Sequence, residues 1–411
     1  MTADQRPRVL AVADSDSYLK WAATTLVALG DTAGSTDVVV VRSPIKPTPG
    51  QAEAAVAGTG LPVPPVLGLP GLWRKLRRER PDVLLLAATG PTAEVVARLA
   101  VRALGRERPV FVSGLPGMGL PATEHGTGWR RWCDIFITHG RREVEAYRDA
   151  FAGHDVTPEL VLTRLPFLPG GPSGAGSGAA REQLTDPVKR LVFAAQPSVP
   201  DEREERLLLL DRLARLSEAG LDVVVKLRAR AGERQTHNEA YPYDSLWEAN
   251  AAGLGHAADT LTFADGPMSA QLIPGTALVT VSSTAALESL AAGLPTVLVG
   301  DLGVREDLLN EPFAASGCMV RLDELVGVLN DGGPHADHEW LEQNYLHAAP
   351  SNLPEAIQNL AGLRAEGGLA PLDDVVPWSS RRHRWSLLRL TVPRPIALAV
   401  AGVRRRLLPG G

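Results

Sequence analysis

The segment Leu278–Gly300, with the sequence LVTVSSTAALESLAAGLPTVLVG, decides the fold of this chain. Its apolar, β-branched beginning at Leu278–Val281 predicts a parallel strand that is covered on both faces. A helix is predicted at Ala285–Ala292, ended by Gly293, and the next strand is predicted at Thr296–Val299. A strand, a helix and a second strand in this order are typical of an α/β domain with a parallel sheet.

Three hydroxyl side chains, those of Ser282, Ser283 and Thr284, stand between the first strand and the helix. A helix that starts after a buried strand offers free N–H groups and the positive end of its dipole, which together bind phosphate. The alternative interpretation is a simple helix cap, since most such hydroxyls only cap helices. Glu288 favours a binding site, because it is the only charge in the predicted helix and has no Ser or Thr three residues earlier to form a capping box.

The composition limits the class of protein. The chain has 411 residues, enough for two or three domains, and its net charge of −5 speaks against a nucleic-acid partner. Its two cysteines, Cys133 and Cys318, form no zinc-ligand spacing, which fits a reducing cytoplasm and no structural metal. No signal-peptide pattern occurs at the start, and no apolar run approaches the roughly 20 residues that span a bilayer. We expect a cytoplasmic protein without a cofactor.

Strand and helix patterns alternate in both halves of the chain, and a stretch rich in glycine and proline separates the halves. This organisation predicts an α/β fold with two Rossmann-like doubly wound domains facing each other across a cleft. The predicted boundaries are residues 1–165 for the first domain, 166–186 for the linker, 187–350 for the second domain, and 351–411 for a C-terminal segment packing back on the first domain. The stretch Ser43–Gly71 contains seven prolines and is expected to be a long functional or mobile loop.

Two acids follow the first predicted strand, Arg8–Ala13, in the tetrapeptide Asp14-Ser15-Asp16-Ser17. Asp and Ser favour helix caps, which is one interpretation of this cluster. Two carboxylates exceed what capping needs, so Asp14 or Asp16 is also a candidate general base toward a hydroxyl. The tetrapeptide also fits the DxDx[ST] start of haloacid-dehalogenase-like phosphatases, although the gap to Lys226, a candidate for their later lysine, crosses the predicted linker.

Basic side chains end a predicted strand of the second half, at Lys226 and Arg228. Both would lie on one face of an extended strand, where they either form surface salt bridges or hold a phosphate. His237, in the loop that follows, is a candidate donor to the phosphate or an ordinary solvated histidine. In the first half, His125 lies within a glycine-rich stretch at 114–128, and His139 follows the predicted strand Asp134–Thr138. Both are candidate polar residues of the cleft.

The C-terminal segment is basic. Residues 381–411 contain eight arginines and no acid, around the apolar run Ile396–Val403. This composition fits a helix packed on the body of the protein, a solvated tail, or a peripheral contact with an anionic membrane through residues 381–406.

With both halves laid out, the chain resembles GT-B-fold glycosyltransferases over most of its length up to about residue 350. The specific part is the motif Ser282-Ser283-Thr284-x3-Glu288-x4-Gly293-x-Pro295. It looks like the donor-nucleotide segment of bacterial transferases that act on cell-surface polymers, including the CMP-Kdo and CMP-sialic-acid capsule transferases and the teichoic-acid CDP-glycerol group. The resemblance implies that Ser282, Ser283 and Thr284 hold donor phosphate and that Glu288 binds a ribose hydroxyl.

Two features of those families are absent here. The His-Pro pair that often follows the preceding strand is replaced by Lys226-Leu227-Arg228, so these cations or His237 take its place. The Asp-Glu-Gly base motif of some sialyltransferases is missing, which leaves Asp14 or Asp16, and then His125, as the candidate base.

The resemblance implies a metal-independent glycosyltransferase that transfers a sugar from a nucleotide-sugar donor to a cell-envelope or surface glycan acceptor, free or lipid-linked. Three alternatives remain open at this point: a nucleotide-sugar epimerase of the same fold, a Mg²⁺-dependent phosphatase, and a non-catalytic module that binds nucleotide sugars.

Overall fold

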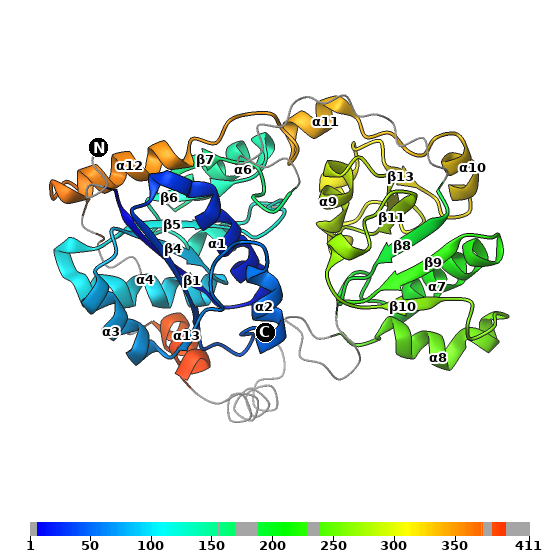
Figure 1. The fold of residues 1–411 in the computed structure, drawn as a ribbon, viewed down its shortest axis with the longest axis horizontal. Coiled ribbons are helices and arrows are strands. Elements are labelled where there is room, and N and C mark those ends of the chain that lie inside the picture. Colours follow the sequence, from blue (N-terminus) through cyan, green and yellow to red (C-terminus); the bar gives the residue numbers. More distant parts are fainter. Residues whose placement is uncertain are drawn as a thin grey trace. The chain divides into compact units, whose positions relative to one another are not determined.

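The computed structural model describes residues 6–154, 156–168, 188–228, 239–370, 372 and 380–391. They belong to two compact units, one made of residues 1–167 and 349–411 and the other of residues 168–348. Each unit is built on one parallel β-sheet (Figure 1). The predicted α/β class, with two Rossmann-like doubly wound domains, is therefore confirmed. The predicted linker 166–186 lies outside the described residues from residue 169 on.

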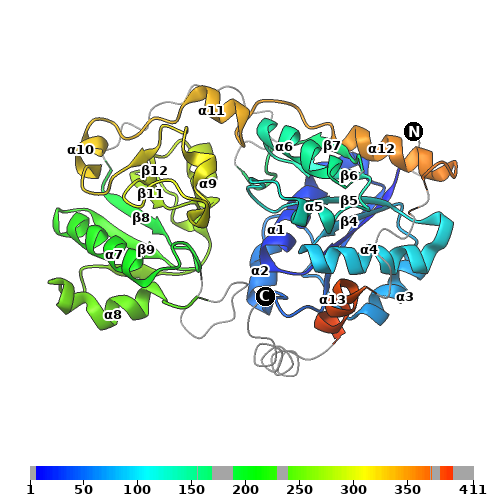
Figure 2. The same ribbon diagram turned by 180° about the vertical axis from the view of Figure 1, so that it is seen from behind.

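The first unit contains a seven-stranded parallel sheet in the order β3-β2-β1-β4-β5-β6-β7. Helices α1, α2 and α12 pack on one face of this sheet, and α3, α4 and α6 pack on the other (Figures 1 and 2). The strands are β1 Arg8–Ala13, β2 Ser35–Val41, β3 Val66–Leu67, β4 Val83–Ala87, β5 Val110–Gly114, β6 Ile135–Thr138 and β7 Glu159–Leu162. The helices are α1 Asp16–Leu29, α2 Pro49–Val56, α3 Leu69–Glu79, α4 Gly90–Leu104, α5 Glu124–Gly128, α6 Arg141–Ala152, α12 Leu353–Ala365 and α13 Arg381–Thr391.

The second unit contains a six-stranded parallel sheet in the order β10-β9-β8-β11-β12-β13. Every residue of β11 is buried, as its continuous apolar run predicts for a strand covered on both faces. The strands are β8 Arg190–Ala194, β9 Asp222–Lys226, β10 Thr262–Ala264, β11 Thr276–Thr280, β12 Thr296–Val299 and β13 Met319–Val320. The helices are α7 Arg203–Glu218, α8 Tyr243–Leu254, α9 Ala285–Ala291, α10 Leu325–Asn330 and α11 His338–Gln343.

Each sheet has a topological switch point, where the chain reverses the direction in which it adds strands. In the first unit the switch lies between β1 and β4, and in the second between β8 and β11, which are hydrogen-bonded neighbours in each case. In open parallel sheets the loops at the carboxyl ends of these two strands diverge and leave room for a ligand. The two switch points are therefore the places where the topology favours binding.

The prediction of one long loop at Ser43–Gly71 is wrong. This stretch contains helix α2 and the short edge strand β3, which pairs with the end of β2. Helix α2 begins with a capping box, in which Gln51 N donates to Thr48 Oγ1 at 3.3 Å and Thr48 N donates to Gln51 Oε1 at 2.9 Å. Pro49 starts this helix rather than breaking it, because the first helical position needs no N–H donor.

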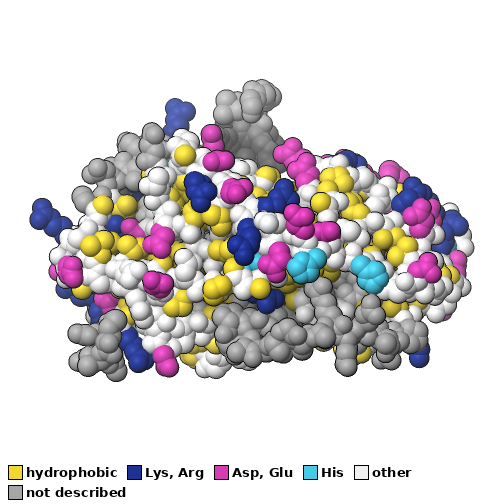
Figure 3. Space-filling view, turned by 90° about the horizontal axis from the view of Figure 1, so that it is seen from above, with side chains coloured by type: hydrophobic (Ala, Val, Ile, Leu, Met, Phe, Trp, Pro, Cys, Tyr) yellow, Lys and Arg dark blue, Asp and Glu magenta, His cyan; other side chains and the backbone are white. Residues whose placement is uncertain are grey.

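The chain returns to the first unit after residue 348. Helix α12 packs on β5 and β7, and Arg364 on this helix donates from Nη1 to Asp82 Oδ1 at 2.7 Å. Helix α13 packs on α4. The described surface carries interspersed acidic and basic side chains (Figure 3). This mixture agrees with the small net charge of the chain.

Candidate functional site

The switch point of the second sheet brings together Ser282, just after β11, and Gln196, just after β8. Ser282 N donates to Gln196 Oε1 at 3.0 Å, and Gln196 Nε2 donates to Ser282 Oγ at 3.2 Å. Ser282 is only 3% exposed. Its hydroxyl is therefore engaged in joining the two strand ends, and Gln196 is a residue of this region that the sequence analysis missed.

The two hydroxyls that follow are more accessible. Ser283 and Thr284 are half-buried, and Ser283 Oγ accepts a hydrogen bond from the N–H of Ala285 at 3.2 Å. Helix α9 then runs for seven residues, with Glu288 half-buried one turn inside it, and Gly293 ends the turn at φ +74° as the sequence predicted. Of the three predicted phosphate-binding hydroxyls, Ser283 and Thr284 are the ones that a ligand can reach.

The predicted cations lie at the same carboxyl edge of the second sheet. Lys226 is the last residue of β9 and is half-buried, whereas Arg228 follows the strand and is exposed. Strand β8 separates β9 from β11, so two strand spacings, or roughly 10 Å, lie between the ends that carry Lys226 and Ser282. The predicted sharing of one strand face by Lys226 and Arg228 does not hold, because β9 ends at Lys226. His237 lies outside the described residues.

A buried arginine holds the loop that positions Gln196. Arg206 on α7 is completely buried and donates to four backbone oxygens, those of Gln196, Pro197, Pro200 and Tyr241, at 2.6–3.3 Å. Its Nη1 also donates to Glu239 Oε1 at 2.7 Å. The sequence analysis missed Arg206, although an arginine in the apolar stripe of α7, in register with Leu209, Leu210 and Leu213, is a signal for a buried cation.

At the switch point of the first sheet, Asp14 follows β1 and Thr89 follows β4. Asp14 is completely buried, and its Oδ2 accepts from Thr89 N at 3.1 Å and from Thr89 Oγ1 at 2.5 Å. Ser43 Oγ donates to the backbone oxygen of Asp14 at 2.8 Å. Burial raises the pKa of Asp14, while the hydrogen bonds from Thr89 oppose this rise.

The other two candidate bases are more accessible than Asp14. Asp16 begins helix α1 and is half-buried, and His125 on α5 is exposed and accepts a hydrogen bond at Nε2 from Trp129 Nε1 at 3.3 Å. Direct contact with a substrate hydroxyl is therefore open to Asp16 and His125. Asp14 reaches a ligand only through the Thr89 hydroxyl that covers it.

His139 is a structural histidine rather than a polar residue facing a cleft. It is 1% exposed, and it accepts at Nε2 from Trp21 Nε1 at 3.0 Å while its Nδ1 faces the backbone oxygen of Thr163 at 2.9 Å. Burial lowers its pKa to about 4, so it is neutral at physiological pH. The glycine-rich stretch beside it is fixed by Glu143, whose Oε1 accepts from Gly119 N at 2.6 Å.

The comparison with known protein families decides the class of this chain. A family model described as "Putative glycosyltransferase (DUF6716)" matches residues 9–360. The chain belongs to this family. The match covers most of the sequence, including both switch points. No protein of curated function matches the chain.

Solved structures with the same architecture support the fold. The chain is 12% identical to a Staphylococcus aureus protein solved as an MnaA–UDP co-structure, with a TM-score of 0.53 over 89% of this chain and 99% of that one. It is 13% identical to a putative UDP-N-acetylglucosamine 2-epimerase from Listeria monocytogenes, with a TM-score of 0.52 over 86% of this chain and 94% of that one. The Neisseria meningitidis UDP-GlcNAc 2-epimerase bound to UDP-GlcNAc gives a TM-score of 0.50 at 11% identity, over 88% and 99%. The resemblance to the GT-B fold is confirmed.

The described residues show neither a metal-binding cluster nor a membrane-spanning helix. Within that part of the chain, no group of three or more His, Cys, Asp or Glu side chains is arranged to hold a metal ion. No described helix has both the length and the apolar character needed to cross a membrane.

Proposed function

We propose that this chain transfers a sugar from a nucleotide-sugar donor to an acceptor hydroxyl, with the donor bound at the carboxyl edge of the second sheet. The observation that carries the proposal is the position of Ser282–Thr284 at the β8/β11 switch point of a chain that belongs to a glycosyltransferase family. Ser283 and Thr284 bind donor phosphate, and Glu288 binds a ribose hydroxyl. Ser282 instead holds the loop in place through Gln196.

In this reaction, the acceptor oxygen forms a bond to the anomeric carbon of the donor sugar, and the bond from that carbon to the nucleotide phosphate breaks. The acceptor proton passes to a base of the first unit, and the departing phosphate keeps the electron pair of the broken bond. Lys226 and Arg228 offset the charge that develops on this phosphate, since fixed cations stabilise such a leaving group most where water is excluded.

The choice of base follows from burial. Asp16 and His125 can meet an acceptor hydroxyl directly, whereas the Asp14 carboxylate lies behind Thr89. We therefore rank Asp16 first and assign Asp14 to positioning Thr89. The phosphatase alternative, which needs Asp14 as an accessible nucleophile, is disfavoured by the same burial.

The acceptor and the cellular setting rest on the resemblance of the donor motif. We propose a cell-envelope or surface glycan acceptor, free or lipid-linked, a cytoplasmic location and a mechanism without a metal ion. Peripheral contact with an anionic membrane through residues 381–406 also belongs to this proposal. Of that segment the structure describes α13, in which Arg381, Arg384 and Arg389 are exposed.

A nucleotide-sugar epimerase is the second candidate. It is favoured by the three similar solved structures with TM-scores of 0.50–0.53, two of which are UDP-GlcNAc 2-epimerases by name. The two functions are separated by incubating the protein with a panel of CMP-, CDP-, UDP- and GDP-sugars and analysing the products. A transferase releases nucleotide in proportion to added acceptor and leaves the sugar configuration of unreacted donor unchanged. Conversion of donor to its epimer without acceptor would refute the transferase, and binding without any turnover would favour a non-catalytic module.

A further inference from the structure

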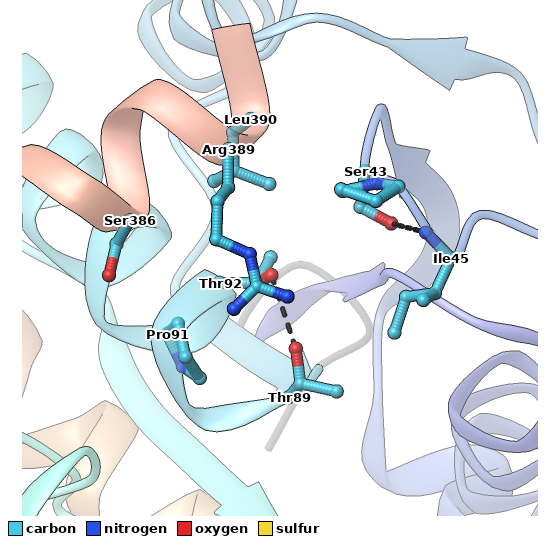
Figure 4. A pocket seen from close by; sticks show the side chains of 9 residues that line it. Ser43, Ile45, Thr89, Pro91, Thr92, Ser386, Arg389 and Leu390 are labelled. Carbon is cyan, nitrogen blue, oxygen red and sulfur yellow. Dashed lines mark hydrogen bonds between the residues drawn. The ribbon is translucent and has the colours of Figure 1, made fainter. Parts of the chain in front are cut away.

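A small pocket lies at the switch point of the first unit, between the ends of β2 and β4 and helix α13 (Figure 4). Its volume of about 30 Å³ is enough for about two water molecules, so a sugar ring does not fit inside it. Polar and apolar side chains share its wall. They are Ser43, Pro44, Ile45, Thr89, Pro91, Thr92, Ser386, Arg389 and Leu390.

Among the described residues that line the pocket, Arg389 is the only charged one. It is exposed, and it makes no hydrogen bond or ion pair with the described residues. In Figure 4 its guanidinium group extends from α13 toward the hydroxyls of Thr89 and Thr92, which lie 3.3 Å from each other. A cation that points into a pocket lined by hydroxyls is suited to an anionic ligand, because guanidinium groups bind phosphate and carboxylate in a fork of two hydrogen bonds.

Contacts elsewhere on α13 fix the position of Arg389. Arg382 Nη2 donates to Glu94 Oε2 and to the backbone oxygen of Gly128, both at 2.8 Å, and its guanidinium stacks 3.4 Å from the centre of the Trp129 ring. Glu94 is 1% exposed, so this ion pair is shielded from solvent on the acid side. The helix is thus held to α4 by one arginine while a second arginine on the same helix is left to face the pocket.

None of the described residues that line the pocket is an acid that could neutralise the charge of Arg389. The Asp14 carboxylate is completely buried behind Thr89 and is faced by Arg130 as well as by the Thr89 N–H and hydroxyl. Helix α4 begins at this wall, and the side chain of Thr89 does not cap it. Its positive end faces the Asp14 carboxylate, which accepts a hydrogen bond from Thr89 N at 3.1 Å.

We propose that this pocket binds a phosphate group of the acceptor, held by the Arg389 guanidinium group, while the Thr89 hydroxyl keeps its hydrogen bond to Asp14. The inference rests on the proposed transferase function and specifies its acceptor as a phosphate-bearing molecule. The apolar part of the wall, Ile45 and Leu390, lies against the organic portion next to the phosphate. The phosphate comes from a soluble sugar or polyol phosphate or from a lipid headgroup, since both carry anionic phosphate oxygens that a guanidinium group binds.

The test is calorimetric titration of the full chain with inorganic phosphate, glycerol 1-phosphate and phosphatidylglycerol vesicles. Arg389→Gln removes the charge from the pocket, and Arg384→Gln is the matched control, because Arg384 is an exposed arginine on the same helix that does not line the pocket. We expect saturable binding of at least one probe, weakened about tenfold or more by Arg389→Gln. For the two soluble probes, to which the proposed membrane contact of Arg384 does not contribute, Arg384→Gln should weaken binding less than about twofold. The probe that binds most tightly identifies a soluble or a lipid source.

Equal affinity of Arg389→Gln and the wild type for every probe, or no binding of any probe, would overturn the proposal. Unfolding curves of both variants exclude a folding defect. The donor site is monitored separately by nucleotide titration of Ser283→Ala, which is expected to bind the acceptor probes as the wild type does. If the wild type binds no nucleotide, the transferase function is refuted. If phosphate binds equally well with and without Arg389, only the acceptor pocket is refuted.

Discussion

Replacing Arg206 by methionine removes the side chain that holds the Gln196 loop. The guanidinium group is completely buried, and its partner Glu239 has a side chain that is 10% exposed. Breaking a buried ion pair by removing one partner costs about 3–5 kcal/mol, since the remaining charge is left in a poor environment. Four backbone oxygens also lose a donor, so we expect a loss at the upper end of this range.

The assay is urea or thermal unfolding combined with nucleotide titration. For a unit of this size, a loss of about 3–5 kcal/mol lowers the melting temperature by roughly 6–20 °C. Arg215→Met is the control, because Arg215 lies on the same helix and pairs with Asp211 at the surface. We expect the Arg206 variant to lose nucleotide affinity as well, since Gln196 then no longer positions Ser282. Wild-type stability in Arg206→Met would refute the reasoning, as would an equal loss in the Arg215 control.

Three further outcomes are expected. The pKa of His139 in the folded protein, about 4, lies below its unfolded value of about 6.5. Its contribution to the free energy of unfolding, up to about 3 kcal/mol, is therefore complete above pH 6.5 and is lost as the pH falls through 4. Urea unfolding at about pH 7 and about pH 4.5 measures this contribution, which a His139→Gln variant should lack. Glu94→Gln weakens the contact with Arg382 and should speed tryptic cleavage within α13 several-fold, whereas an unchanged cleavage rate would mean that other contacts hold this helix. Chelation with EDTA should leave sugar transfer unchanged, and restoration of lost activity by Mg²⁺ would contradict the metal-independent mechanism.

The strands could be predicted from the sequence because they are buried on both faces. Apolar runs such as those in Arg8–Ala13 and Thr296–Val299 are typical of strands covered on both faces, and their predicted bounds agree with β1 and β12. Helix α2 was missed since its prolines suggested a loop, although Pro49 occupies the one helical position where proline is favourable.

The candidate site was predictable only in its outline. A hydroxyl run between a strand and a helix indicates the edge of the sheet, and the structure places Ser282–Thr284 there. The sequence does not reveal that Ser282 is used to bind Gln196, because that contact joins residues 86 positions apart. Burial of Asp14 behind Thr89, 75 positions away, is hidden for the same reason. Neither Gln196 nor Thr89 lies in a local sequence pattern that indicates its contact.

The central claim is that the second unit binds a nucleotide sugar at Ser283, Thr284 and Glu288. Calorimetric titration of the wild type, Ser283→Ala and Glu288→Gln with CMP, CDP, UDP, GDP and their sugars tests it most directly. The account predicts that at least one nucleotide binds the wild type and that each substitution weakens this binding about tenfold, as expected for the loss of a hydrogen bond to a charged group or ribose. Binding of the same nucleotide with unchanged affinity by both variants would contradict the account.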